Sequence, residues 1–120
     1  MPSDYEFEMP WAPSVNSCWM HTRQGVKLSK RGRQYRFDAM TRLDNLKLSG
    51  ELISGNVSVH LTLNPPTLRR YDADNFSKAL LDSLSHGRFW VDDEQVHKIT
   101  VEKGVKVKGG NVMVKINLIS

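Results

Sequence analysis

The stretch Val57-Ser58-Val59-His60-Leu61-Thr62-Leu63-Asn64 is the clearest secondary-structure signal in the chain. Apolar and polar residues alternate along it, which is the period of a β-strand with one buried face. Pro65 and Pro66 follow directly and end the strand, because proline has no N–H to donate to a sheet. We therefore predict a strand over residues 57–64. His60 lies on its polar face and is expected to be a surface histidine, not a ligand.

Further strands are expected on both sides of this one. Residues 5–9 alternate in the same way before Pro10, and residues 96–103 and 111–119 have the composition of two more strands. Gly109 and Gly110 lie in the connection between the last two. Glycines in a short connection favour a turn, so these two strands are predicted to form an antiparallel hairpin.

Two helices are expected between the strands. Ser29 is a good N-cap, and a helical apolar stripe follows it over about residues 30–47, although Gly32 weakens the first turn by roughly 0.5–1 kcal/mol. A second stripe runs from Phe76 to Leu84 and ends near Gly87. Residues 11–26 are expected to form a loop. The predicted fold is α+β, of order β-α-β-α-β-β, with a small mixed sheet covered by two helices.

The length of 120 residues fits a single domain over residues 1–120 with a modest core. Homodimerisation is one way to cover the remaining apolar surface. The acidic N-terminus does not resemble a signal peptide, and no apolar run approaches the ~18 residues typical of a membrane span. Cys18 is the single cysteine and cannot form an internal disulfide, so we expect a small buried side chain and a cytoplasmic protein.

The formal net charge is +4, and its distribution is uneven. Between residues 27 and 47 only Asp38 and Asp44 oppose a run of basic residues, namely Lys27, Lys30, Arg31, Arg33, Arg36, Arg42 and Lys47. Such a stripe suits a phosphate backbone. An ordinary solvated helix face explains the charge equally well.

The motif with the most chemical content is Asp72-x-Asp74-Asn75-x-x-Lys78, followed by Asp92-Asp93 after the second helix. Mg²⁺ prefers oxygen ligands, and two or three converging carboxylates would hold it beside a phosphate. Asp72 and Asp74 share a face if the chain between them is extended, and diverge if it is helical. Lys78 is one turn after Asp74, within reach of a phosphate oxygen.

Each of these residues also has a structural alternative. Asp72 or Asp74 could cap a helix, and Lys78 could pair with Asp74 or Asp82 on the surface. Asp92-Asp93 could simply form the turn before a strand. Spacing alone slightly favours these structural roles over catalysis.

Three blocks together resemble the RusA family of Holliday junction resolvases, the crossover junction endodeoxyribonucleases. They are Pro10-Trp11-Ala12-Pro13-Ser14-x-Asn16, Asp72-x-Asp74-Asn75-x-x-Lys78-x-x-x-Asp82, and Phe89-Trp90-x-Asp92-Asp93-x-Gln95-Val96. Their order and spacing match the family over nearly the whole chain. Two positions depart from the pattern: Tyr71 stands where the family can carry arginine, and Ala12 where a second proline is common.

The resemblance implies a homodimeric, Mg²⁺-dependent endonuclease that nicks two opposed strands of a four-way DNA junction. The family's catalytic aspartates, which are also its metal ligands, fall on Asp72, Asp74 and Asp93, and its functional lysine falls on Lys78. Asp92 and Asn75 take supporting roles.

Flanking phosphates are expected to contact six basic residues, namely Arg69, Arg70, Lys30, Arg31, Arg33 and Arg36. Phe89, Trp90 and Trp19 are possible wedges at the branch point, but core positions are expected for them instead. Two alternatives to the resolvase function stay open: a protein that binds branched DNA without cutting it, and a nuclease for flaps or forks with the same site.

Overall fold

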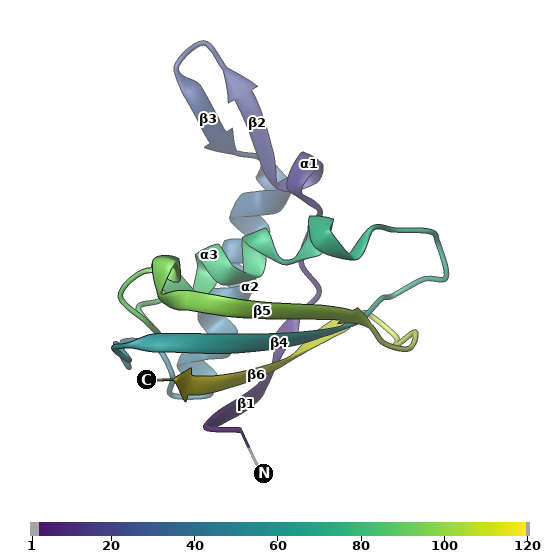
Figure 1. Ribbon diagram of the computed structural model, residues 1–120. Helices are drawn as coiled ribbons and strands as arrows, with labels where there is room; N and C mark the ends of the chain where they lie inside the picture. Colours follow the sequence, from purple (N-terminus) through teal and green to yellow (C-terminus); the bar gives the residue numbers. More distant parts are fainter. Residues whose placement is uncertain (1–2, 120) are drawn as a thin grey trace.

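The predicted central strand, β4 (Asn56–Asn64), lies inside a four-stranded sheet of order β1-β6-β4-β5 in the computed structural model, which describes residues 3–119. The other strands are β1 (Tyr5–Pro10), β5 (Val96–Lys103) and β6 (Asn111–Ile119). β6 pairs antiparallel with both β1 and β4, whereas β5 pairs parallel with β4 (Figure 1). The prediction of an α+β domain with a small mixed sheet is confirmed.

The predicted hairpin between the last two strands is wrong, because β4 lies between β5 and β6. The buried face of β6 explains its place: Val112, Val114 and Ile116 are opposite Leu63, Leu61 and Val59 of β4, and all six side chains are buried. Most of β5 is exposed, which suits the edge of the sheet. The glycine-containing connection over residues 104–110 therefore crosses from one side of β4 to the other.

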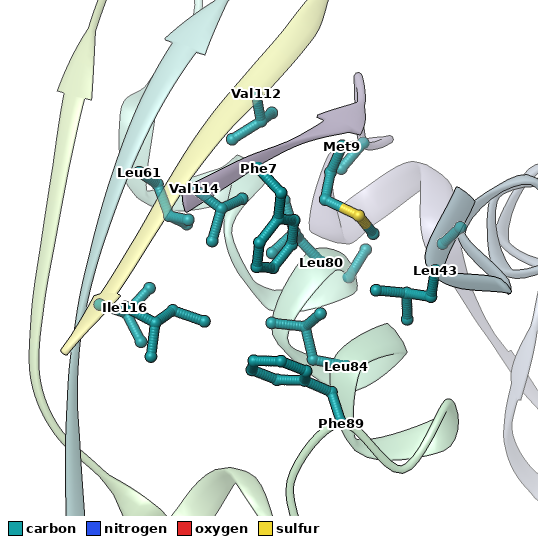
Figure 2. Close-up of a cluster of buried hydrophobic side chains, with 14 of the residues drawn as sticks. Phe7, Met9, Leu43, Leu61, Leu80, Leu84, Phe89, Val112, Val114 and Ile116 are labelled. Atoms are coloured by element: carbon teal, nitrogen blue, oxygen red, sulfur yellow. The ribbon is translucent and has the colours of Figure 1, made fainter. Parts of the chain in front are cut away.

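The two long helices, α2 (Lys30–Asn45) and α3 (Lys78–His86), cover the apolar face of the sheet (Figure 1). Figure 2 shows the resulting core, in which Leu80, Leu84 and Phe89 point toward the β1 and β6 side chains. Ser29 caps α2 as predicted, since its hydroxyl accepts a hydrogen bond from the backbone N–H of Gly32. α2 ends two residues before the predicted end because Lys47 has a positive φ of 59°.

The predicted loop over residues 11–26 is mostly regular structure. It contains the short helix α1 (Val15–Cys18) and strand β2 (Trp19–Thr22), which pairs antiparallel with β3 (Gly25–Leu28). This hairpin projects from the rest of the molecule (Figure 1), and most of its residues are at least partly exposed. Strands that bury neither face lack apolar alternation, so the sequence pattern could not reveal them.

Gly32 has a packing role that the sequence did not indicate. A Cβ atom at this position would lie 2.3 Å from the carbonyl oxygen of Cys18. The first turn of α2 can approach the end of α1 this closely only because residue 32 has no side chain. Cys18 itself is 2% exposed, as expected for a small buried side chain.

Two short 3-10 helices complete the fold. η1 (Ala73–Phe76) comes directly before α3, and η2 (Asp93–Gln95) comes directly before β5. Together these two turns contain several of the predicted site residues. Over residues 3–119, the chain forms no helix with the length and apolar character that a membrane span requires.

Candidate active site

Asp72 and Asp74 are exposed carboxylates at the start of η1. The backbone is extended at Asp72, with φ −97° and ψ 123°, but the 3-10 turn already begins at Ala73. The two side chains therefore do not share a strand face, which was the arrangement most favourable to a shared metal. Capping does not account for them either: Asp72 makes no side-chain cap hydrogen bond, and the residue before α3 is Ser77.

Lys78 begins α3 and is held by neighbours on two sides. Its Nζ lies 3.2 Å from Oδ2 of Asp82, one turn further along the helix. The same Nζ lies 4.9 Å from the ring centre of Trp19, at the start of the projecting hairpin. The pair with Asp82 is one of the structural alternatives for Lys78, and it draws the ammonium group toward the second turn of α3.

Asp92 and Asp93 have different environments. Asp92 accepts a hydrogen bond from the backbone N–H of Glu94 at 2.9 Å and forms a capping box with Gln95. The hydrogen bond from this N–H lowers the pKa of Asp92. Asp92 therefore has the structural role of a turn residue, in keeping with its supporting place in the predicted site.

Asp93 points toward α3 instead. Burial raises the pKa of Asp93, and the neighbouring carboxyl groups of Asp92 and Asp82 raise it further. Asp82 therefore stands between Asp93 and Lys78, with which it pairs. It was not among the predicted site residues, and only its place in the second sequence block pointed to it.

The donor chemistry of this region suits a hard divalent cation, since every candidate ligand is a carboxylate and Asp93 is surrounded by like charge. The geometry is incomplete. Over residues 3–119, no three His, Cys, Asp or Glu side chains are grouped closely enough to hold one ion. The structure brings Asp93 to Asp82 and Lys78, whereas Asp72 and Asp74 lie at the other end of this region, before α3.

The predicted DNA-binding residues differ in their exposure. Arg69 and Arg70 are exposed on the segment between β4 and η1, and Lys30 and Arg31 are exposed at the start of α2. Arg33 is also exposed, but its guanidinium donates to the Leu28 carbonyl at 2.9 Å. Arg36 is half-buried beside Cys18 and Asp82. The most accessible basic groups therefore lie near the start of α2 and before η1.

Phe89 and Trp90 are fully buried, so they belong to the core as expected and cannot act as wedges without unfolding. Trp19 is only half-buried and packs against Lys78. Three other aromatic residues, Trp11, Tyr71 and Phe76, contact one another, and two of them flank Asp72 and Asp74 in the chain. Only Trp11 was part of the sequence blocks, and nothing in the spacing showed that the three are in contact.

Comparison with known proteins extends over nearly the whole chain. Residues 9–118 match the family described as Endodeoxyribonuclease RusA. The chain is 38% identical over 114 residues to the crossover junction endodeoxyribonuclease rusA of Enterobacteria phage HK97, covering 95% of this chain and 94% of that protein. It is 34% identical over 112 residues to the protein named crossover junction endodeoxyribonuclease RusA in Escherichia coli strain K12, covering 93% of this chain and 92% of that one.

A third relative, the crossover junction endodeoxyribonuclease rusA of Enterobacteria phage 82, is 33% identical over 112 residues, covering 93% of this chain and 92% of that protein. The order of the three sequence blocks agrees with these matches. The chain is a member of the RusA family of endodeoxyribonucleases.

Proposed function

We propose that this protein is a structure-specific DNA endonuclease that resolves four-way junctions by Mg²⁺-dependent hydrolysis of phosphodiester bonds. Family membership over residues 9–118 supports the reaction class, and its relatives are named for crossover junctions. The observation that carries the proposal is the contact of Lys78 with Asp82 beside Asp93. This pairing places a fixed positive charge next to an acidic residue with a raised pKa.

The proposed metal ligands are Asp72, Asp74 and Asp93. Bound Mg²⁺ would polarise a phosphate and lower the pKa of a coordinated water. Because no three such side chains are grouped over residues 3–119, the three carboxylates would have to move closer together to share one ion. Asp92 supports this site by holding the η2 turn with its capping box, and Asn75 supports it from within η1.

Lys78 contributes charge to the same site. An ammonium group that is already held in place can stabilise negative charge on a phosphate oxygen without the cost of reorientation. Asp82 pairs with the ammonium at 3.2 Å, and the ammonium also lies over the Trp19 ring, 4.9 Å from its centre. In this proposal Lys78 contacts the reacting phosphate and Asp82 positions Lys78.

The DNA backbone would lie across the exposed basic residues on either side of the site. Arg69 and Arg70 precede Asp72 directly in the chain, and Lys30 and Arg31 stand at the start of α2. Arg33 and Arg36 have local partners, so their contribution to binding is expected to be smaller. Contacts of this kind hold phosphates and do not select sequence.

A homodimer would supply two equivalent sites for two equivalent strands of the junction. The edge strand β5 supports an assembly of this kind, because it pairs with β4 on one side only. Its central apolar residue Ile99 is 43% exposed. An open edge with an exposed apolar side chain is a ready surface for pairing with a second copy.

The test is to map nicks on a synthetic four-way junction labelled on one strand at a time, beside matched flap, fork and linear duplexes. The proposal predicts paired nicks at symmetric positions on opposed strands of the junction, dependent on Mg²⁺. Faster cutting of flaps or forks would support the alternative substrate. Tight junction binding without nicks in any of the substrates would support a protein that binds branches without cutting them.

A further inference from the structure

A wide groove lies between the start of α2 and the segment that joins β4 to η1, which leads into Asp72. Its volume is about 520 Å³, within the roughly 300–1,000 Å³ typical of small-molecule sites. A second hollow of about 190 Å³ shares Trp11, Thr67, Arg69 and Phe76 with it, so the two are continuous. The function proposed above uses only two of its lining residues, Arg31 and Arg69, as phosphate contacts.

Aromatic rings form one wall of the groove. The rings of Trp11 and Phe76 lie 5.0 Å apart at an angle of 36°, and Tyr71 meets both rings edge-on. All three side chains are only half-buried, although large aromatic residues of this kind usually belong in the core. Trp11 and Phe76 line the groove itself, whereas Tyr71 lines the adjoining hollow and has Nζ of Lys103 4.4 Å from its ring centre.

Two residues of this aromatic wall are close in the chain to Asp72 and Asp74. Tyr71 comes directly before Asp72, and Phe76 is two residues after Asp74. A ligand held against these rings would therefore lie beside the proposed site of chemistry.

Polar and charged residues form the rest of the lining. Arg31 and Arg69 are exposed on opposite sides of the groove, one from α2 and one from the β4–η1 segment. Gln34 and Asp38 lie together on α2, where the Gln34 amide donates to the Asp38 carboxylate at 3.0 Å. Guanidinium groups attract phosphate, whereas a carboxylate repels it and accepts hydrogen bonds from base amino or imino groups.

We propose that this groove binds one unstacked nucleotide of the branched DNA, with its base against Trp11 and Phe76 and its phosphates at Arg31 and Arg69. The base edge then lies toward Gln34 and Asp38. Charge complementarity and the aromatic wall favour a nucleotide over an apolar ligand, and aromatic rings accept any base because each has a flat face.

This inference rests on the proposed function, since linear duplex offers no unstacked base. Enzymes and architectural proteins that act on distorted DNA commonly unstack bases, and the energetic cost is lowest where pairing is already interrupted. The branch point of a junction is such a place. The groove would thus help to select branched DNA and bring the neighbouring phosphate to Asp72 and Asp74.

Photo-crosslinking tests the groove directly. Four-way junctions carry a single 5-iodo-deoxyuridine at successive positions around the branch point, are bound to the full chain without Mg²⁺, and are irradiated. The expected result is a cross-link from a nucleotide beside the branch point to Trp11, Tyr71 or Phe76, identified by peptide mass spectrometry. The matching linear duplex gives no cross-link at these residues.

A variant that fills the groove provides an independent test. Gln34 is exposed on α2, so Gln34→Trp places a large side chain in the groove without disturbing the core. The matched control is Thr41→Trp, an exposed position on the same helix outside the groove. Loss of one base stack predicts about 5- to 150-fold weaker junction binding for Gln34→Trp, with linear-duplex binding unchanged.

The possible outcomes distinguish failure of the nucleotide site from failure of the proposed endonuclease function. If the protein nicks junctions but gives no aromatic cross-link, and Gln34→Trp binds them as tightly as Thr41→Trp, the nucleotide site is wrong and the proposed function stands. If the protein neither binds nor cuts branched DNA, both proposals fail. Equal weakening of junction and linear-duplex binding by Gln34→Trp would also overturn the groove, because it would show a general loss of phosphate contacts.

Discussion

Nζ of Lys78 lies 3.2 Å from Oδ2 of Asp82, so the ammonium group proposed for catalysis is paired with a carboxylate one helical turn away. The carboxyl group of Asp82 also raises the pKa of Asp93. Through Asp82, α3 therefore links the lysine to the η2 turn.

The first prediction concerns Lys78. Removal of a fixed positive charge that acts on the transition state typically slows a reaction by about 10²–10³-fold. We expect Lys78→Ala to lower the single-turnover rate of junction nicking by this amount, with a much smaller change in junction binding without metal. Asp82→Asn should slow nicking less, because the ammonium remains but is no longer held.

The stability of these variants supplies the control. The Lys78–Asp82 pair is exposed, so its loss should cost only about 0.3–0.5 kcal/mol of unfolding free energy. Nicking by Lys78→Ala at the parent rate would remove this residue from the mechanism.

The second prediction concerns the pH dependence contributed by Asp93. Its folded-state pKa is raised above the ordinary value of 3.8, so folding favours the protonated carboxyl. The contribution of Asp93 to the free energy of unfolding is therefore complete below about pH 4, and it is lost as the pH rises through the folded-state pKa of Asp93. Asp93→Asn, which stays neutral, should therefore melt at a higher temperature than the parent at pH 7 in metal-free buffer, and the difference should shrink at pH 4.

The matched control is Asp44→Asn at an exposed position on α2, whose melting temperature is compared with that of the parent at the same two pH values. If Mg²⁺ binds Asp93, millimolar Mg²⁺ should raise the melting temperature of the parent and leave Asp93→Asn unchanged. A parent protein that is more stable than Asp93→Asn at pH 7 without metal would contradict the assigned pKa shift.

The third prediction concerns Gly32. At an exposed helix position, replacing glycine by alanine usually stabilises a protein by about 0.5–1 kcal/mol. Here the added Cβ would lie 2.3 Å from the Cys18 carbonyl oxygen, and the first turn of α2 would have to move. Gly32→Ala should instead destabilise by about 1–3 kcal/mol, as overpacked sites do. Urea unfolding measures the sign, and the exposed Thr41→Ala variant should change stability by no more than about 0.5 kcal/mol.

The fourth prediction concerns the edge strand β5. If two copies pair through this edge, a charge at Ile99 should disrupt the dimer. We expect Ile99→Lys to shift the solution mass from dimer to monomer in light scattering. Val26→Lys, at an exposed apolar position in the projecting hairpin, should leave the mass unchanged. A dimer that persists in Ile99→Lys would place the interface elsewhere.

The elements with one buried face were predictable from the sequence, whereas the exposed β2–β3 hairpin was not. The alternation from Val57 to Leu63 gave the central strand, and Ser29 marked the start of α2. The β2–β3 hairpin was missed because it buries neither face. The sheet order was also missed, since turn glycines show that two strands can come close but not that β4 lies between them.

The candidate site was predictable as a set of residues, whereas its arrangement was not. The sequence blocks contained Asp72, Asp74, Lys78 and Asp93. Spacing could not show that the 3-10 turn begins at Ala73 or that Asp93 turns toward Asp82. These features depend on tertiary contacts between α3 and the η2 turn, which leave no periodic signal in the chain.

The most direct test of the central claim, that Asp72, Asp74 and Asp93 form one metal-dependent site, is the single-turnover rate of nicking of a strand-labelled four-way junction by the parent and by Asp74→Asn. We predict nicking by the parent in Mg²⁺ and none in EDTA. Asp74→Asn should still bind the junction but nick it more than about a hundredfold more slowly. Removing a group that only supports a metal ligand costs up to about a hundredfold, and removing a ligand itself should cost more. Equal rates for the two proteins, or parent activity that persists in EDTA, would contradict the account.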